Sequence, residues 1–254
     1  MKKILTTAIL CAGLVGFTAC DSFLDEEPKS SLTLDTYYKT SADIIGNVNY
    51  LYRDGAPDKM GNMTGAYRGS SLSVMNMVTG YFVNEYEGQE VDCSYARQLT
   101  RQNFTQSCCN YLTNDTWKGC YKSINVANAV IKYVDGVEMD GQAQYKAEAR
   151  FFRALNYFYL VKMFGDVPMI TEPTEDATLV EYPARTAASE VYKTVIIPDL
   201  QFAVENLPDA TFAGNSHRVT KYAADMLLAD VYMRLGEYAL SLIHISEPTR
   251  LDVI

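Results

Sequence analysis

Histidine and paired cysteines are scarce in this chain of 254 residues, and their scarcity excludes several kinds of chemistry. The sequence has two histidines and no C-x₂-C pair, so the ligand spacing of a zinc site is absent. A Ser/His/Asp or Cys/His hydrolase would have to use His217 as its base, and we expect His217 instead to be a loop residue before a helix. No G-x-G-x-x-G or phosphate loop occurs, and we expect no cofactor.

Positive charge is also in short supply. The chain has 31 acidic and 22 basic residues and a net charge of −9. An acidic surface repels phosphate backbones, which argues against nucleic acid as a partner. It is compatible with neutral sugars, which need no opposite charge. A hydrophobic content of 48% with 21% charged residues is typical of a globular protein.

The N-terminus has the pattern of an export signal. Lys2 and Lys3 precede an apolar run over residues 4–17, which is shorter than the roughly 20 residues of a membrane-spanning helix. Small residues at positions 18 and 19 then precede Cys20, as in the lipobox of bacterial lipoproteins, although Phe17 departs from the usual aliphatic residue. We expect residues 1–19 to be a signal peptide and Cys20 to be acylated as the first mature residue.

The C-terminus has a different peculiarity. Residues 240–250 read LSLIHISEPTR, and this string back-translates codon by codon into a transposase adapter used in preparing sequencing libraries. The last four residues fit an index read followed by further adapter bases. We therefore expect residues 240–254 to be a non-native tail, with Ala239 as about the last native position.

Four cysteines follow Cys20, at positions 93, 108, 109 and 120. An exported protein can keep disulfides, and four thiols allow three pairings. The adjacent Cys108 and Cys109 are awkward to bridge to each other. We expect one of them to pair with Cys93 or Cys120, and the remaining thiols to be buried as small apolar side chains.

Apart from its ends, the chain shows helical periodicity with one long interruption. Residues 20–34 are predicted to be a polar, extended tether, and residues 35–52 one helix or two short ones. From residue 54 to about 113 the periodicity fails and glycines recur, which predicts irregular structure. Further helices are expected over residues 114–134, 142–164, 187–206 with a bend at Pro198, and 221–235 ending at Gly236. The fold class is therefore mainly α.

Carboxylates gather in the irregular region, at Glu85, Glu87, Glu90 and Asp92. Two such groups could serve a glycoside hydrolase as acid and nucleophile or base. Acidic clusters in glycine-rich segments are more often solvated loops, and we expect this one to be non-catalytic.

Several sequence blocks, together and in order, resemble the SusD/RagB family. They are Phe23-Leu-Asp with Pro28, the spaced set Trp117, Tyr121, Ile124, Ala127, Asn128 and Ile131, the run from Ala147 to Pro168, Pro183 and Arg185 ahead of residues 190–208, and the run from Arg218 to Ala224. In addition, residues 227–239 resemble one helix and turn of a tetratricopeptide repeat. The resemblance implies that residues 35–239 form the N-terminal part of an α-α superhelix of tetratricopeptide-like helix pairs.

The same resemblance implies a function. Members of this family are lipid-anchored at the outer membrane, face the exterior and work with a SusC-like TonB-dependent transporter to import oligosaccharides or polysaccharides. Binding involves no catalysis, and irregular loops carry part of the ligand surface. The candidates here are Tyr81, Asn84, Tyr86 and Tyr95. The alternatives are a lipid-anchored peptide-binding scaffold of the RagB type and, less favoured, a surface glycoside hydrolase.

Overall fold

The computed structural model describes residues 34–53, 78–81, 97–103, 105–174 and 183–246. The chain divides into two units, residues 1–37 and 38–254. In the first unit only the short helix α2 (Leu34–Tyr37) is described. The predicted helical stretch over residues 35–52 therefore resolves into two helices, α2 and α3 (Ser41–Arg53).

Thr40 and Asp43 form a cap at the start of helix α3. The backbone N–H of Thr40 donates to the Asp43 carboxylate at 2.8 Å, and the Thr40 hydroxyl donates to the same oxygen at 2.7 Å. In return the backbone N–H of Asp43 donates to the Thr40 hydroxyl at 3.4 Å, which satisfies a donor that the first helical turn leaves without a partner. The apolar stripe of α3 is then buried in the second unit through Ile44, Val48 and Leu51.

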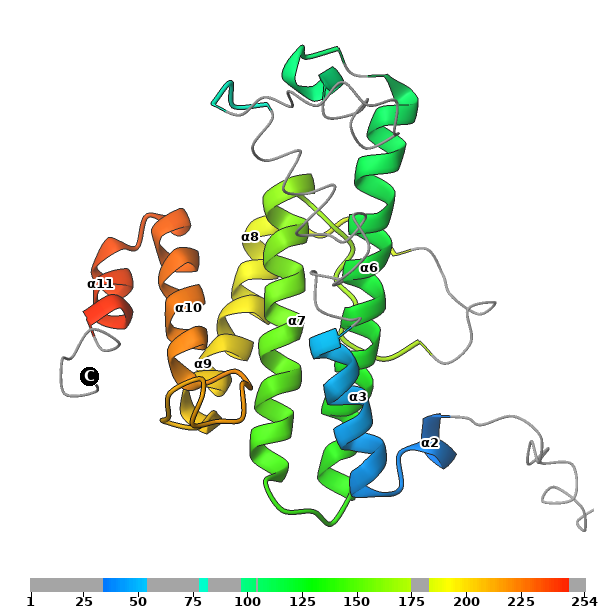
Figure 1. Ribbon diagram of the computed structural model, residues 1–254, viewed down its shortest axis with the longest axis vertical. Helices are drawn as coiled ribbons and strands as arrows, with labels where there is room; N and C mark the ends of the chain where they lie inside the picture. Colours follow the sequence, from blue (N-terminus) through cyan, green and yellow to red (C-terminus); the bar gives the residue numbers. More distant parts are fainter. Residues whose placement is uncertain (1–33, 54–77, 82–96, 104, 175–182, 247–254) are drawn as a thin grey trace, which may run out of the picture. The chain divides into compact units, whose positions relative to one another are not determined.

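Two long helices form the centre of this unit (Figure 1). They are α6 (Gln106–Tyr133) and α7 (Gln142–Phe164), joined by the 3₁₀ turn η2 (Val134–Gly136). Helix α7 is packed by α3 and α6 on one side and by α9 (Ile197–Asn206) on another. The second half of α7 is apolar on nearly every face, and a helix without a polar face must be covered on several sides.

Helix α6 starts earlier than its sequence predicts. The periodicity indicated a start at Asn114, whereas the helix begins at Gln106. Residues 106–113 are half polar and show no clear apolar period, but they contain neither glycine nor proline to stop a helix. Periodicity detects a buried stripe rather than helix formation itself, so this first part of the helix was missed.

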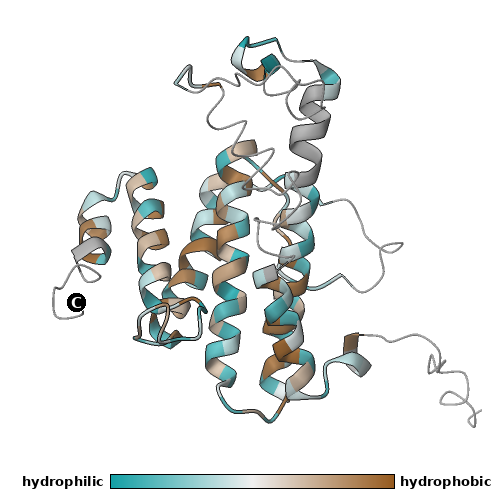
Figure 2. Cartoon of the chain, viewed as in Figure 1, coloured by the Kyte–Doolittle hydropathy of each residue, from teal (hydrophilic) through white to brown (hydrophobic). Residues whose placement is uncertain are grey.

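The helical run continues across Pro198, where the sequence predicts a bend, and a π-helical stretch lies just before it. Helix α8 (Ala188–Val191) continues through the π-helix η3 (Tyr192–Ile196) into α9, and Pro198 stands in the first turn of α9. Proline cannot donate a backbone hydrogen bond, and the first helical turn is where that donor is not needed. Figure 2 shows the apolar residues along this run, which include the buried Val195, Ile196 and Leu200.

The last helices form a pair. Helix α10 (Lys221–Leu235) ends at Gly236, which is left-handed with φ 79°, and both its bounds match the prediction. Helix α11 (Tyr238–Ser246) packs against α10 and includes residues 240–246 of the expected adapter tail. A helix forms from suitable composition whatever its origin, so the assignment of residues 240–254 stays a prediction.

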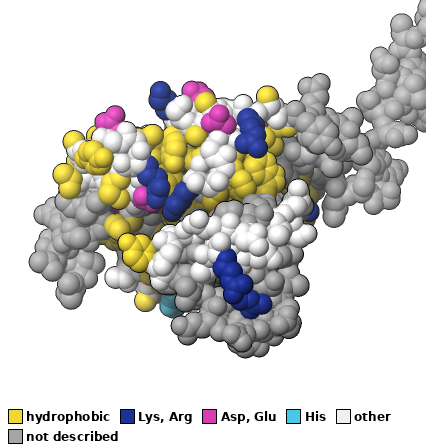
Figure 3. All heavy atoms as spheres, turned by 90° about the horizontal axis from the view of Figure 1, so that it is seen from above, with side chains coloured by type: hydrophobic (Ala, Val, Ile, Leu, Met, Phe, Trp, Pro, Cys, Tyr) yellow, Lys and Arg dark blue, Asp and Glu magenta, His cyan; other side chains and the backbone are white. Residues whose placement is uncertain are grey.

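Several large apolar side chains of the pair are exposed. Exposed side chains on α10 include Met226 and Met233, and those on α11 include Tyr238, Leu242 and Ile243. Figure 3 shows hydrophobic side chains gathered where these two helices lie.

The mainly α fold class is confirmed. Within the described ranges the only β pairing is an isolated bridge between Val167 and Thr186. None of the described helices is long and apolar enough to cross a membrane.

Candidate functional site

The structure places one of the four candidate ligand residues. Tyr81 follows Gly80 in a turn and is 89% exposed, and its backbone N–H donates to the Thr79 hydroxyl at 3.3 Å. Its phenol ring is therefore available for stacking. Asn84, Tyr86 and Tyr95 lie outside the described residues, as do the carboxylates between Glu85 and Asp92. Their roles stay predictions.

The cysteines are described in part. Cys120 is buried and carries a free thiol, so the pairing of Cys120 with Cys108 or Cys109 is not formed. Burial raises the pKa of this thiol to about 12, which keeps it protonated and unreactive. Cys20, Cys93 and the side chains of Cys108 and Cys109 lie outside the described residues, so acylation and a bridge to Cys93 stay predictions.

His217 lies in the turn that precedes α10, where sequence reasoning expected it. Its backbone is left-handed, with φ 61°, and its ring packs edge-on against Phe212 at 5.2 Å between centroids. Among the described residues no group of three His, Cys, Asp or Glu side chains is arranged to hold a metal ion.

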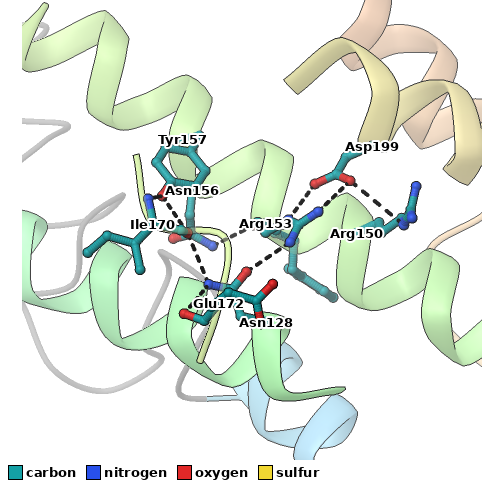
Figure 4. Close-up of polar contacts among 9 residues, drawn as sticks. Asn128, Arg150, Arg153, Asn156, Tyr157, Ile170, Glu172 and Asp199 are labelled. Atoms are coloured by element: carbon teal, nitrogen blue, oxygen red, sulfur yellow. Dashed lines mark hydrogen bonds and ion pairs between the residues drawn. The ribbon is translucent and has the colours of Figure 1, made fainter. Parts of the chain in front are cut away.

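A buried ion pair ties together the centre of the second unit (Figure 4). Arg153 of α7 donates to both carboxylate oxygens of Asp199 on α9, at 2.6 and 2.8 Å, and to Asn128 Oδ1 of α6 at 2.9 Å. Burial raises the pKa of Asp199, whereas the hydrogen bonds from Arg153 lower it. The guanidinium stays charged at any physiological pH, so its hydrogen bonds to Asp199 and Asn128 persist. They fix the positions of α6, α7 and α9 relative to one another.

An extended segment after α7 is held by side chains of the two long helices. Tyr157 accepts a hydrogen bond from the Ile170 N–H at 2.6 Å and donates to the Ile170 carbonyl at 2.8 Å. Asn128 also donates to the Ile170 carbonyl, and Tyr121 donates to the Pro168 carbonyl at 2.7 Å. Figure 4 shows the first of these contacts. The segment is therefore anchored to the core through its backbone.

A second ion pair joins three distant parts of the chain. Arg218 donates to Glu148 at 2.6 Å, and the Glu148 side chain is fully buried. Arg218 also donates to Asn49 Oδ1 on α3 at 2.8 Å, and its guanidinium lies 4.8 Å from the ring centroid of Tyr52. Tyr52 in turn donates to Glu148 at 2.9 Å. The contact connects α3, α7 and the turn before α10.

Sequence reasoning did not find these two ion pairs. Glu148 and Asp199 stand among polar and apolar residues of ordinary helices, and nothing local distinguishes them from solvated carboxylates. A carboxylate on the apolar side of a predicted helix is the only available signal. Both pairs bind residues to one another, so they form a rigid frame and leave ligand contacts to the segments that the frame supports.

Comparison with known proteins shows where this frame belongs. The family model SusD-like, described as starch-binding associating with outer membrane, matches residues 22–233. The match covers most of the sequence, and the chain belongs to the SusD-like family. The resemblance stated from sequence blocks is thereby confirmed.

Individual relatives agree. SusD-like protein P2 of Formosa agariphila is 30% identical over 241 residues, which are 94% of this chain and 44% of that protein. A crystal structure of a SusD superfamily protein from Parabacteroides distasonis covers 80% of this chain and 43% of its own, with 28% identity and a TM-score of 0.64. A laminarin-binding SusD-like protein covers 83% and 43%, with 26% identity and a TM-score of 0.66. The chain thus spans less than half the length of these relatives.

Proposed function

We propose that this chain is part of a surface glycan-binding lipoprotein that works with a SusC-like TonB-dependent transporter to import oligosaccharides. The observation that carries the proposal is the family match over residues 22–233, together with a relative whose name states that it binds laminarin. Cys20 would anchor the protein to the outer membrane, with the folded part facing the cell exterior.

One described residue supports glycan binding. Sugar rings present apolar C–H faces and outward hydroxyls, so proteins hold them with exposed aromatic rings and with amide or carboxylate acceptors. Tyr81 is an exposed aromatic ring of this kind. Together with Asn84, Tyr86 and Tyr95, which lie outside the described residues, it is our candidate for ligand contact.

Calorimetric titration of the full chain with laminarin, starch and other neutral polysaccharides tests the proposal. We expect saturable heat with at least one glycan and no release of shorter products during the same experiment. Tyr81→Ala should weaken that binding, whereas Tyr37→Ala, which removes another exposed tyrosine, should leave it unchanged. Saturable binding of peptides with no binding of glycans would favour the RagB-type scaffold, and product release would favour a hydrolase.

The anchor and the partner need separate tests. Expression of the full chain with Cys20→Ser should abolish incorporation of labelled palmitate and release the protein from outer-membrane fractions. Cys120→Ser is the matched control, because that thiol is buried and lies outside the predicted signal peptide in the sequence. Co-purification of a TonB-dependent transporter with the tagged full-length protein, from cells grown on the bound glycan, tests the partnership. If the transporter is absent from such preparations, the partnership is refuted.

A further inference from the structure

A cavity of about 880 Å³ opens where α3 begins and where the connection between α6 and α7 turns. Its volume lies within the range of about 300–1,000 Å³ that is common for small-ligand sites. Tyr81, the one candidate ligand residue that the structure describes, does not line it. The lining includes Ile45 of α3, Tyr145 of α7 and, from the connection, Gly136, Glu138, Met139 and Asp140.

The walls combine apolar surface with a fixed aromatic ring. Ile45 and Met139 contribute aliphatic and thioether surface, and Tyr145 contributes its phenol. The guanidinium of Arg218 lies 5.3 Å from the centroid of the Tyr145 ring, and Arg218 is itself held by Glu148. The ion pair between Arg218 and the buried Glu148 therefore restrains the Tyr145 ring. A ring that is already restrained loses less side-chain entropy when a ligand binds than a mobile ring would.

The rim is acidic, and most of its charge is not neutralised. Asp135 forms an ion pair with Lys146, whereas Glu138 and Asp140 are exposed and make no ion pair among the described residues. Carboxylates accept hydrogen bonds from hydroxyl groups and repel anions at short range. The net charge of −9 acts in the same direction.

We propose that this cavity is a second ligand site, which binds a segment of a neutral oligosaccharide and excludes uronic-acid or sulfated chains. The side chains of Ile45, Met139 and Tyr145 match the C–H faces of sugar rings, and the rim carboxylates match their hydroxyls. A lysine or arginine side chain of a protein partner would suit the charge but would fill only a small part of the volume. The inference rests on the proposed function and deepens it by giving the ligand a second contact and a charge preference.

A large side chain at Gly136 would obstruct the cavity without disturbing the core. A Cβ added at Gly136 meets nothing within 4 Å, and its backbone is not left-handed. Gly136→Trp should therefore place an indole ring in the cavity and obstruct ligand binding there, with Gly136→Ala as the small control. Gly119→Trp adds the same bulk on α6, also where an added Cβ meets nothing, and it lies outside the cavity lining.

Met139 reports on the cavity directly. In the full chain labelled with ¹³C-methyl methionine, its resonance is assigned from Met139→Leu. We expect laminarihexaose or maltohexaose at millimolar concentration to shift this resonance saturably, and a galacturonic acid hexamer to leave it unchanged. Gly136→Trp should abolish the shift, and both glycine controls should keep it. Glu138→Gln with Asp140→Asn should weaken binding roughly tenfold, since hydrogen bonds to charged acceptors are lost.

Parallel calorimetry separates this inference from the proposed function. If neutral oligosaccharides release heat but Met139 does not respond and Gly136→Trp binds as well as the original chain, the cavity site is refuted and glycan binding stands. If no neutral oligosaccharide gives heat or moves Met139, both proposals fail. A lysine-rich peptide that shifts Met139 where sugars do not would overturn the ligand class in favour of a basic protein segment.

Discussion

Replacing Asp199 by alanine should cost far more stability than replacing an exposed carboxylate. The side chain of Asp199 is 3% exposed, and its partner Arg153 is 10% exposed. Arg150 Nε lies 3.8 Å from the same carboxylate and has no hydrogen-bond partner of its own. The substitution leaves a buried guanidinium without a counter-charge, for which about 3–5 kcal/mol is typical.

Urea unfolding of the full chain at neutral pH, followed by circular dichroism, measures this effect. Asp230→Ala is the matched control, because Asp230 pairs with Arg234 at 3.1 Å on the surface of α10, with side chains 36% and 39% exposed. We expect that control to cost less than about 1 kcal/mol. Equal losses for the two variants would refute the reasoning.

A double replacement distinguishes charge pairing from packing. Arg153→Met combined with Asp199→Leu removes both charges and keeps apolar volume, and such exchanges are often neutral or stabilising. The double variant should therefore recover most of the stability that Asp199→Ala loses. If it is as unstable as the single variant, the pair contributes through its shape and not through its charge.

Three further predictions concern the helix termini and the anchored segment. Hydrogen bonds from Thr40 hold the pKa of Asp43 below its ordinary value of 3.8. The stability that this cap contributes is therefore present above pH 3.8 and is lost as the pH falls through the pKa of the folded protein. NMR titration of the Asp43 carboxyl group measures that pKa, and a value at or above 3.8 would contradict the prediction. Gly236→Ala should destabilise the protein by about 1–2 kcal/mol, because the backbone of Gly236 is left-handed with φ +79°. Gly119→Ala should stabilise it by up to about 1 kcal/mol, because an added Cβ in the middle of α6 meets nothing within 4 Å. Thermal unfolding that ranks the two variants the other way would contradict this prediction. Tyr157→Phe leaves Ile170 without its hydroxyl partner, at a cost of about 1–3 kcal/mol, and should speed hydrogen exchange at the Ile170 amide; unchanged exchange would show that the anchor is dispensable.

The parts of the fold that were predicted correctly follow from local rules. The bounds of α7 and α10 match because an apolar period and a terminal glycine act within a few residues. The missed start of α6 has no such signal. The ion pairs were also missed, since Arg153 and Asp199 are 46 residues apart and only tertiary packing brings them together. The cavity combines residues from two distant segments in the same way.

The candidate site likewise has one part that the sequence predicts and another that depends on long-range packing. The candidate tyrosines follow from the family resemblance, which implies ligand contacts in irregular loops, and Tyr81 is exposed as that reasoning requires. The residues that restrain Tyr145 at the cavity cannot be proposed in this way, because Arg218 and Glu148 are separated by 70 positions and show no motif that links them. The family resemblance thus indicates which chemistry is available, and long-range packing decides where it operates.

The contact between Asn49 and Arg218 spans 169 positions of the chain, which has a consequence for the order of folding. Closing so long a loop is entropically slow, and α3 cannot be joined to the turn before α10 until both segments are present. During synthesis α3 therefore cannot make this contact until Arg218 has been added. Until then α3 is held by its packing against α6 and α7 alone.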